Sequence, residues 1–108
     1  MKIGDMIKVT VDRPLGSRHP QHPDIVYSVN YGYVEGVMGG DGEWQDVYIL
    51  GVKVPVSNFE GRLIAILHRL DDAEDKWVAA PEGQFFSDEE VLAAVQFQEQ
   101  YFHTQLIR

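Results

Sequence analysis

The sequence predicts a mainly β domain of the α+β class: a small, closed or nearly closed barrel of about five mostly antiparallel strands, covered by a C-terminal helix. Three observations support this prediction. Short apolar stretches rich in β-branched and aromatic residues alternate with glycine, proline and aspartate. Only one stretch has the start signal and spacing of a helix. The chain of 108 residues is long enough for one modest core, so we expect a single domain over residues 1–108.

The predicted strands follow one another with turn residues between them. They cover residues 6–11, 25–34, 46–50, 61–70 and 76–80. Apolar and polar residues alternate in the first, as expected for a half-buried strand, whereas the fourth is the most apolar run and should be central. Pro14 and Gly16 end the first strand, because proline removes a ladder donor and glycine permits a turn.

The start of the helix is marked by the capping-box sequence Ser87-Asp88-Glu89-Glu90. Ser87 is the expected N-cap, and Glu90 follows at the position from which its side chain bonds back to the cap. Acidic residues in the first turn also offset the helix dipole. Apolar residues then recur at helical spacing, namely Val91, Ala94, Val95, Tyr101 and Phe102. We therefore expect this helix to lie across the sheet and cover the core.

Composition narrows the classes of partner and compartment. The hydrophobic content of 44% is that of a folded globular protein. Because the chain has no cysteine, disulfides and thiolate metal sites are excluded, which fits the cytoplasm as the expected location. The formal net charge of -8 argues against nucleic acid as a partner, since that binding depends on Lys and Arg. No signal-peptide pattern and no apolar run of membrane-spanning length occurs, so we expect no membrane partner.

Two acid-rich stretches carry the candidate chemistry. In the first, residues 41–46, three carboxylates surround Gly42 at a spacing that cannot share one strand face, because strand side chains alternate. A loop entering a strand would let them converge on a hard cation such as Mg²⁺, which takes oxygen ligands. The second stretch, residues 71–76, has four acids and one lysine, and such acids repel one another unless a cation or solvent relieves them. An acidic turn and a solvated charged loop are the alternatives.

Aromatic residues near the middle of the chain allow two interpretations. Tyr27, Tyr31 and Tyr33 share one parity, so a continuous strand would present three phenols on one face. These rings could line the core, or their hydroxyl groups could donate to a bound anion. The nearby His19 and His22 lie in a proline-spaced loop without a third ligand, so we expect solvent-facing residues there and no transition-metal site.

Five blocks of residues occur in a characteristic order. They are Val11-Asp12-Arg13-Pro14, Tyr27-Ser28-Val29-Asn30-Tyr31-Gly32-Tyr33, Asp41-Gly42-Glu43-Trp44-Gln45-Asp46-Val47, the acidic loop with Lys76-Trp77-Val78-Ala79-Ala80-Pro81, and Phe97-Gln98-Glu99-Gln100-Tyr101. This order resembles that of the soluble family I inorganic pyrophosphatases. The resemblance implies a five-stranded barrel of the oligonucleotide-binding (OB) type and Mg²⁺-dependent hydrolysis of pyrophosphate to two phosphates. It also implies a homo-oligomer, since members of that family commonly form them.

The resemblance further implies roles for individual residues. The implied metal ligands are Asp41, Asp46, Asp71 and Asp75. The implied catalytic carboxylates are Glu43, assisting the attacking water, and Asp46. The implied phosphate contacts are Arg13, Tyr31, Lys76 and Tyr101. In the reaction so implied, metal ions activate a bound water and bridge phosphoryl oxygens, while the cations absorb charge on the leaving phosphate.

The chain also departs from the family pattern. Glu43 stands where the family usually has aspartate, which moves a carboxylate outward by one methylene, and Trp44 replaces a small or acidic neighbour. Phe102 stands where a lysine is expected, and the upstream acidic and lysine positions of the family have no counterpart. The sequence therefore predicts a reduced site, in which Arg13 and Lys76 remain as the phosphate-binding cations unless Arg18 or another basic residue substitutes for the missing ones.

Three functional hypotheses follow from these residues. The first is Mg²⁺-dependent hydrolysis of pyrophosphate. The second is a diverged family member that binds metal and phosphate, or hydrolyses another small diphosphate with weak or altered activity. The third, ranked lowest because of the acidic charge, is a non-enzymatic OB-like module that stacks single-stranded nucleic acid on its aromatic strand.

Overall fold

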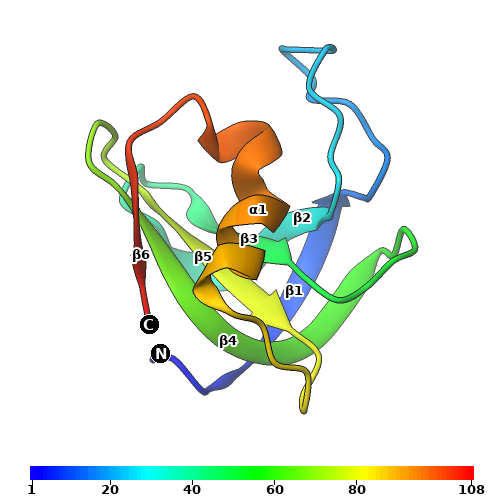
Figure 1. Ribbon diagram of the computed structural model, residues 1–108, viewed down its shortest axis with the longest axis vertical. Helices are drawn as coiled ribbons and strands as arrows, with labels where there is room; N and C mark the ends of the chain where they lie inside the picture. Colours follow the sequence, from blue (N-terminus) through cyan, green and yellow to red (C-terminus); the bar gives the residue numbers. More distant parts are fainter.

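A computed structural model describes all residues 1–108 and shows a barrel with one helix and a short additional strand (Figure 1). The elements are β1 (Met6–Arg13), β2 (Asn30–Met38), β3 (Trp44–Ile49), β4 (Asn58–Arg69), β5 (Asp75–Ala80), α1 (Asp88–Glu99) and β6 (Thr104–Ile107). The predicted fold class, a small five-stranded barrel with a C-terminal helix, is confirmed.

The barrel closes because its first and fourth strands pair. The strand order is β1-β2-β3-β5-β4, and a further pairing joins β4 back to β1. Every pair is antiparallel except β3 with β5. One edge of β4 pairs first with β1 and then, near its end, with β6. Closure leaves the barrel without a free hydrogen-bonding edge, which is how small all-β folds avoid edge-to-edge aggregation.

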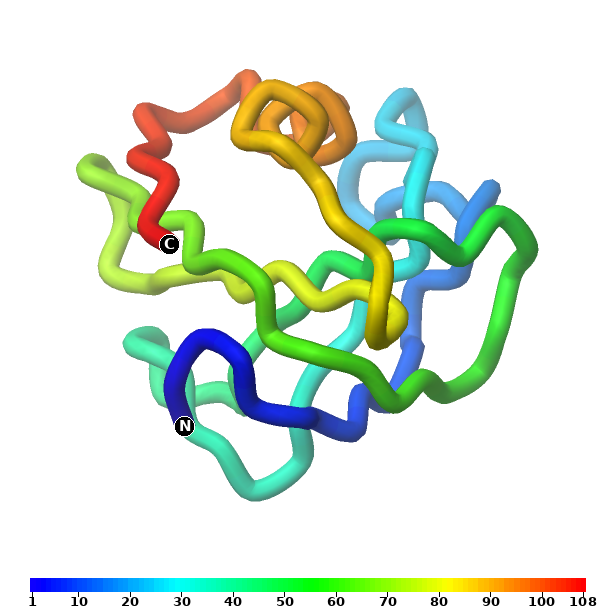
Figure 2. Tube along the Cα trace, turned by 60° about the horizontal axis from the view of Figure 1, so that its bottom comes forward, coloured from blue at the N-terminus to red at the C-terminus, as the bar shows by residue number.

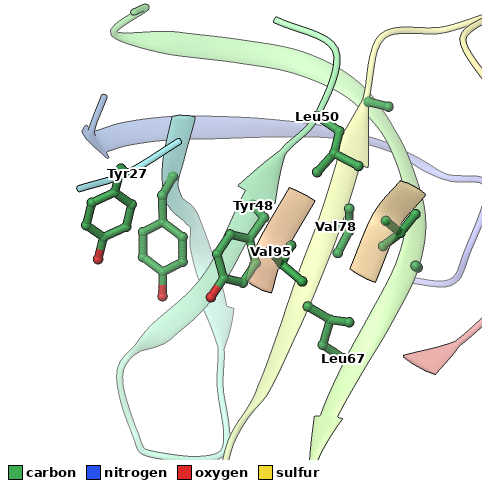
Figure 3. Packing of buried hydrophobic residues seen from close by; sticks show 10 residues of the cluster. Tyr27, Tyr48, Leu50, Leu67, Val78 and Val95 are labelled. Carbon is green, nitrogen blue, oxygen red and sulfur yellow. The ribbon is translucent and has the colours of Figure 1, made fainter. Parts of the chain in front are cut away.

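A bulge in β4 lets one run of alternating residues serve two cores. Leu63 lies opposite Ala79 and belongs to the cluster to which all five barrel strands contribute. The register then shifts, and Ala65 lies opposite Val78 in the cluster that packs against α1. The bulge adds one residue to β4, and this residue turns the side chains that follow it to the other face of the strand. Side chains two positions apart, such as those of Leu63 and Ala65, therefore point into different cores. Figure 3 shows the second cluster, where Val78 lies near Val95 of α1.

The helix begins as predicted and ends earlier than predicted. Ser87 Oγ accepts a hydrogen bond from the Glu90 backbone at 3.2 Å, and the Glu90 side chain accepts one from the Ser87 backbone at 2.9 Å. The prediction that Tyr101 and Phe102 continue the apolar stripe is wrong, since α1 ends at Glu99 and Tyr101 is 59% exposed. The buried helix residues are Val91, Val95, Gln98 and Glu99. No helix in the protein has the length and apolar character needed to cross a membrane.

The segment before β2 is a loop, not the strand predicted from residue 25. β2 begins at Asn30, whose buried side chain accepts from the backbone N–H groups of Leu15 (2.9 Å) and Val56 (3.2 Å). It also donates to the Val54 carbonyl oxygen at 2.9 Å. The bond to Leu15 ties the start of this loop to β2, and the other two bonds tie residues 54–56 to the same side chain. β6 was not predicted either, because its four residues follow the stripe that had been assigned to the helix.

Gly32 is required where β1 and β2 come close together. A Cβ at this position would lie 1.9 Å from the Thr10 carbonyl oxygen, which is a backbone atom that cannot rotate away. We expect Gly32→Ala to lower the free energy of unfolding by about 3 kcal/mol, since overpacking forces backbone shifts. Urea denaturation would measure this loss, with Glu35→Ala on the exposed face of β2 as the control. An unchanged midpoint for Gly32→Ala would contradict this account of the barrel.

Candidate active site

A cavity of about 560 Å³ opens where the end of α1, the loop of residues 14–29 and the barrel strands meet. Figure 1 and Figure 2 show that loop beside α1 at one end of the barrel. Residues from distant parts of the chain converge here because neighbouring strands bring them to one face. Of the site residues predicted from the sequence, the cavity is lined by Arg13, Tyr31, Asp46, Lys76 and Tyr101.

Lys76 is a buried cation held between two carboxylates. Its Nζ atom donates to Asp46 Oδ2 at 2.6 Å and lies 2.6 Å from Glu74 Oε1. The lysine side chain is 4% exposed, so its charge must be paired, since an unpaired buried charge is very costly. Parallel β3 and β5 place Asp46 and Lys76 side by side across the strand boundary. Asp46 itself is 30% exposed and borders the cavity.

The structure does not bring the four predicted metal ligands together. Asp75 faces away from Lys76, because successive strand side chains alternate, and its carboxylate contacts His68 Nδ1 at 2.7 Å. Asp71 lies in the turn after β4 and accepts from the His103 backbone N–H at 3.2 Å. No group of three or more histidine, aspartate or glutamate side chains is arranged to hold a metal ion.

Asp41, another predicted ligand, forms a carboxyl pair with Glu74. The hydrogen bond to Glu74, followed by the one from the Glu43 backbone, lowers the pKa of Asp41. Burial and then the hydrogen bond to Asp41 raise the pKa of Glu74, although Lys76 opposes this change. Glu43, the predicted assistant of the attacking water, is exposed and lies outside the cavity lining.

Hydrogen bonds under the cavity link Arg13 to the helix. Arg13 donates to the Tyr27 hydroxyl at 2.6 Å, and that hydroxyl donates to Gln98 Oε1 at 2.9 Å. Gln98 Nε2 in turn donates to the Tyr48 hydroxyl at 2.7 Å. Figure 3 shows the hydroxyl groups of Tyr27 and Tyr48 directed to the same side. The tyrosine rings thus line the core, while their hydroxyl groups hold the cavity residues in place.

The network continues from Tyr48 to a second buried cation, Arg69. Glu99 binds the guanidinium of Arg69 through both carboxylate oxygens, at 3.1 and 2.5 Å, and accepts from the Tyr48 hydroxyl at 2.6 Å and from Thr104 at 2.8 Å. Burial by itself raises the pKa of Glu99, but the hydrogen bonds from Arg69, Tyr48 and Thr104 outweigh it and lower this pKa. The guanidinium also lies 3.6 Å from the ring centre of Phe102.

Arg13 is the cavity cation without an ion-pair partner. Lys76 and Arg69 are both paired with carboxylates, whereas no carboxylate forms an ion pair with Arg13. Burial lowers the pKa of Arg13, but the hydrogen bond with Tyr27 and the charge interactions with Tyr27, Tyr31 and Asp12 together outweigh it and raise this pKa, so the group stays charged. Its guanidinium carbon lies 5.6 Å from the Tyr31 ring centre. A half-buried guanidinium with free donors is well suited to bind a phosphate or carboxylate.

Sequence reasoning assigned no site role to several residues that shape this cavity. They are His19, His22, Arg69, Glu74, Gln98, Glu99 and Phe102. His22 is exposed, as expected, and also borders the cavity, whereas His19 is half-buried in the cavity wall. One signal was present in the sequence: Gln98 and Glu99 occupy the same helical stripe as Val91 and Val95, where polar residues need buried partners.

Comparison with solved structures shows similar folds in bacterial inorganic pyrophosphatases. The enzyme from Neisseria gonorrhoeae is 20% identical, with a TM-score of 0.71 and coverage of 91% of this chain and 74% of the other. That from Ehrlichia chaffeensis is 17% identical, with a TM-score of 0.71 and coverage of 97% and 86%. That from Thermus thermophilus is 13% identical, with a TM-score of 0.62 and coverage of 100% and 86%.

Neither a protein-family model nor a curated protein sequence matches the chain. At these low identities the similarity to the solved structures shows the fold alone. The similarity nevertheless extends over nearly the whole of this chain. The chain therefore has the fold of the bacterial inorganic pyrophosphatases, which confirms, at the level of the fold, the resemblance carried by its sequence blocks.

Proposed function

We propose that this protein hydrolyses small diphosphates, inorganic pyrophosphate first among them, in a Mg²⁺-dependent reaction. The observation that carries the proposal is the cavity in which unpaired Arg13 lies near the Asp46–Lys76 pair. The cavity is thus bordered both by cations that can bind phosphoryl oxygens and by a carboxylate that can bind a water molecule. The fold shared with inorganic pyrophosphatases supports the same activity.

The chain's own residues have distinct parts in the proposed reaction. Arg13 and Lys76 bind phosphoryl oxygens and absorb the charge that develops on the leaving phosphate. Asp46 orients the attacking water and accepts its proton. The water oxygen bonds to one phosphorus, the bond from that phosphorus to the bridging oxygen breaks, and the second phosphate leaves. Tyr31, whose pKa is raised by burial and then by Asp46, stays a neutral hydrogen-bond donor.

The side chains that border the cavity suit a Mg²⁺ ion that enters bound to the diphosphate. They suit less well a resident ion held by protein ligands alone. Mg²⁺ is commonly held by one or two carboxylates together with substrate phosphates and water. Asp46 and Glu74, which both contact Lys76 and line the cavity, supply carboxylates of that kind. When bound, the ion would lower the pKa of a coordinated water and neutralise phosphoryl oxygens.

Several roles implied by the resemblance stay predictions. They concern Glu43 as assistant of the water, Asp71 and Asp75 as metal ligands, and Tyr101 as a phosphate contact. The homo-oligomeric state and the cytoplasmic location stay predictions as well. Alanine variants of Asp71 and Asp75 would test the ligand roles, since neither residue borders the cavity in this structure.

One observation favours the second candidate function, in which the protein binds metal and phosphate without efficient hydrolysis. Lys76 lies between Asp46 and Glu74, and Arg69 is bound by Glu99, so the carboxylates nearest the cavity are already neutralised by the chain's own cations. Calorimetry would separate the two candidates. Heat on adding Mg²⁺ and phosphate, with no phosphate released from pyrophosphate, would support binding alone.

Phosphate release from pyrophosphate, with and without Mg²⁺, tests the hydrolase proposal directly. We expect release that requires Mg²⁺, and we expect Arg13→Gln to lower kcat/KM by about 10- to 100-fold, because a hydrogen bond to a charged group contributes roughly 1.5–3 kcal/mol. Arg62→Gln is the matched control, since Arg62 is exposed and pairs with Glu82 outside the cavity. Equal activity in wild type and Arg13→Gln would reject the proposed role of Arg13.

A further inference from the structure

Two phosphoryl groups would fill only part of the cavity. Its charged side is formed by Arg13, Asp46, Arg69, Glu74 and Lys76, whereas a second wall comes from the loop of residues 14–29. We propose that this wall binds the aromatic base of a nucleoside diphosphate whose phosphates lie on the charged side. This inference rests on the proposed function, because it takes the position of the diphosphate from it.

The size of the cavity supports a ligand larger than pyrophosphate. Its volume of about 560 Å³ lies within the range of roughly 300–1,000 Å³ typical of pockets for drug-sized molecules. A pyrophosphate bound at Arg13 and Lys76 would occupy the charged side only. The remaining space is bordered by His19, Gln21, His22, Asp24 and Ile25 of the loop.

An aromatic series leads from the core to this wall. The Tyr27 ring packs edge-on against Phe97 of α1, with ring centres 5.3 Å apart. The His19 ring stacks on Tyr27 at 6.3 Å with an interplanar angle of 13°, and His22 follows at 5.0 Å from His19. Tyr27 is fully buried, so the series positions the two imidazoles from the inside. His22 is tilted by 51° from His19, and an aromatic ring at a cavity wall suits a planar base.

The loop that carries these rings is held by its own hydrogen bonds. The His19 backbone donates to Ile25 at 2.9 Å, and the Ile25 backbone donates to His22 at 2.9 Å. Arg18 crosses the loop and donates to the Pro23 carbonyl oxygen at 2.7 Å. A preorganised wall loses less conformational entropy when a ligand binds than a flexible loop does.

Polar groups beside the imidazoles match the edge of a base. Gln21 and Asp24 both line the cavity on the loop side. An amide offers donors and an acceptor, and a carboxylate accepts from an amino group, as in the recognition of base edges elsewhere. Stacking alone would fit any aromatic ester of a diphosphate. The neighbouring amide and carboxylate therefore point to a nucleobase.

Calorimetric titration with two non-hydrolysable ligands tests this inference. The probes are α,β-methylene-ADP and methylenediphosphonate, both with Mg²⁺ at one fixed concentration. We expect wild type to bind the ADP analogue at least tenfold more tightly. His22→Ala should weaken binding of the ADP analogue about tenfold, because the base loses the ring on which it stacks, and should leave binding of methylenediphosphonate unchanged. Gln21→Ala should act in the same direction and keep its backbone bond to His19.

The controls separate this inference from the proposed function. His103→Ala replaces an exposed histidine outside the cavity and should alter neither affinity. Equal affinity of wild type for both ligands, or an equal loss of both in His22→Ala, would overturn the base-binding wall while diphosphate binding stands. Failure of both ligands to bind would reject the diphosphate site as well.

Discussion

Asp46→Asn is expected to lower kcat for pyrophosphate hydrolysis by about 100-fold or more. The carboxylate that borders the cavity becomes an amide, which is a poor proton acceptor and a weak ligand for Mg²⁺. Lys76 also loses one of its two acidic partners and keeps only Glu74. Removing a single preorganised electrostatic group commonly costs 10²–10³ in kcat, or about 3–4 kcal/mol. Phosphate release at saturating substrate and Mg²⁺ would measure the change.

Two comparisons make this result specific to the chemistry. Asp5→Asn is the matched control, because the Asp5 carboxylate accepts from the Lys2 backbone and lies outside the cavity. Asp46→Glu keeps the charge but moves it by one methylene, so we expect it to recover only part of the activity. If Asp46→Asn retained the wild-type kcat, the role of Asp46 in orienting water would be rejected.

Much of the fold could be predicted because it depends on local patterns. The first, third, fourth and fifth strands and the cap at Ser87 follow from alternation and short-range chemistry. The bulge after Leu63 could not be predicted, since the register shift depends on the partner strand and leaves the alternation of buried residues unbroken. The loop before Asn30 escaped prediction for a similar reason: Asn30, which starts β2, bonds to residues 15, 54 and 56, which are distant from it in sequence.

The site was predictable only in part, because its ion pairs join distant residues. Asp46 and Lys76 are 30 residues apart in sequence, and so are Arg69 and Glu99. A charged loop in the sequence does not reveal which acids share a face. Asp75 neighbours Lys76 in the chain, yet it projects to the opposite face of β5 and contacts His68. Sequence blocks therefore indicated the family of folds more reliably than the partners of each carboxylate.

Glu99→Gln is expected to lower the free energy of unfolding by about 3 kcal/mol at pH 7. The substitution keeps the size of the side chain but leaves the buried guanidinium of Arg69 without its bidentate partner. Breaking a buried ion pair typically costs roughly 3–5 kcal/mol, and the lower figure applies here because Asp72 and Glu74 lie within 3.4 Å of Arg69. Denaturant titration would measure the loss. Glu89→Gln, on the exposed first turn of α1, should cost only a few tenths of a kcal/mol.

The pH dependence of the same variant distinguishes lost charge from lost packing. The folded protein holds the pKa of Glu99 below its ordinary value of 4.5, so the ionised carboxylate stabilises the fold above that pH. This contribution is lost as pH falls through the lowered pKa, because wild-type Glu99 then becomes neutral as well. The stability difference between wild type and Glu99→Gln should therefore be largest at neutral pH and should narrow below pH 4.5. A difference that stays constant down to acidic pH would show that the variant acts through packing, and that the bond to Arg69 contributes little charge-dependent stability.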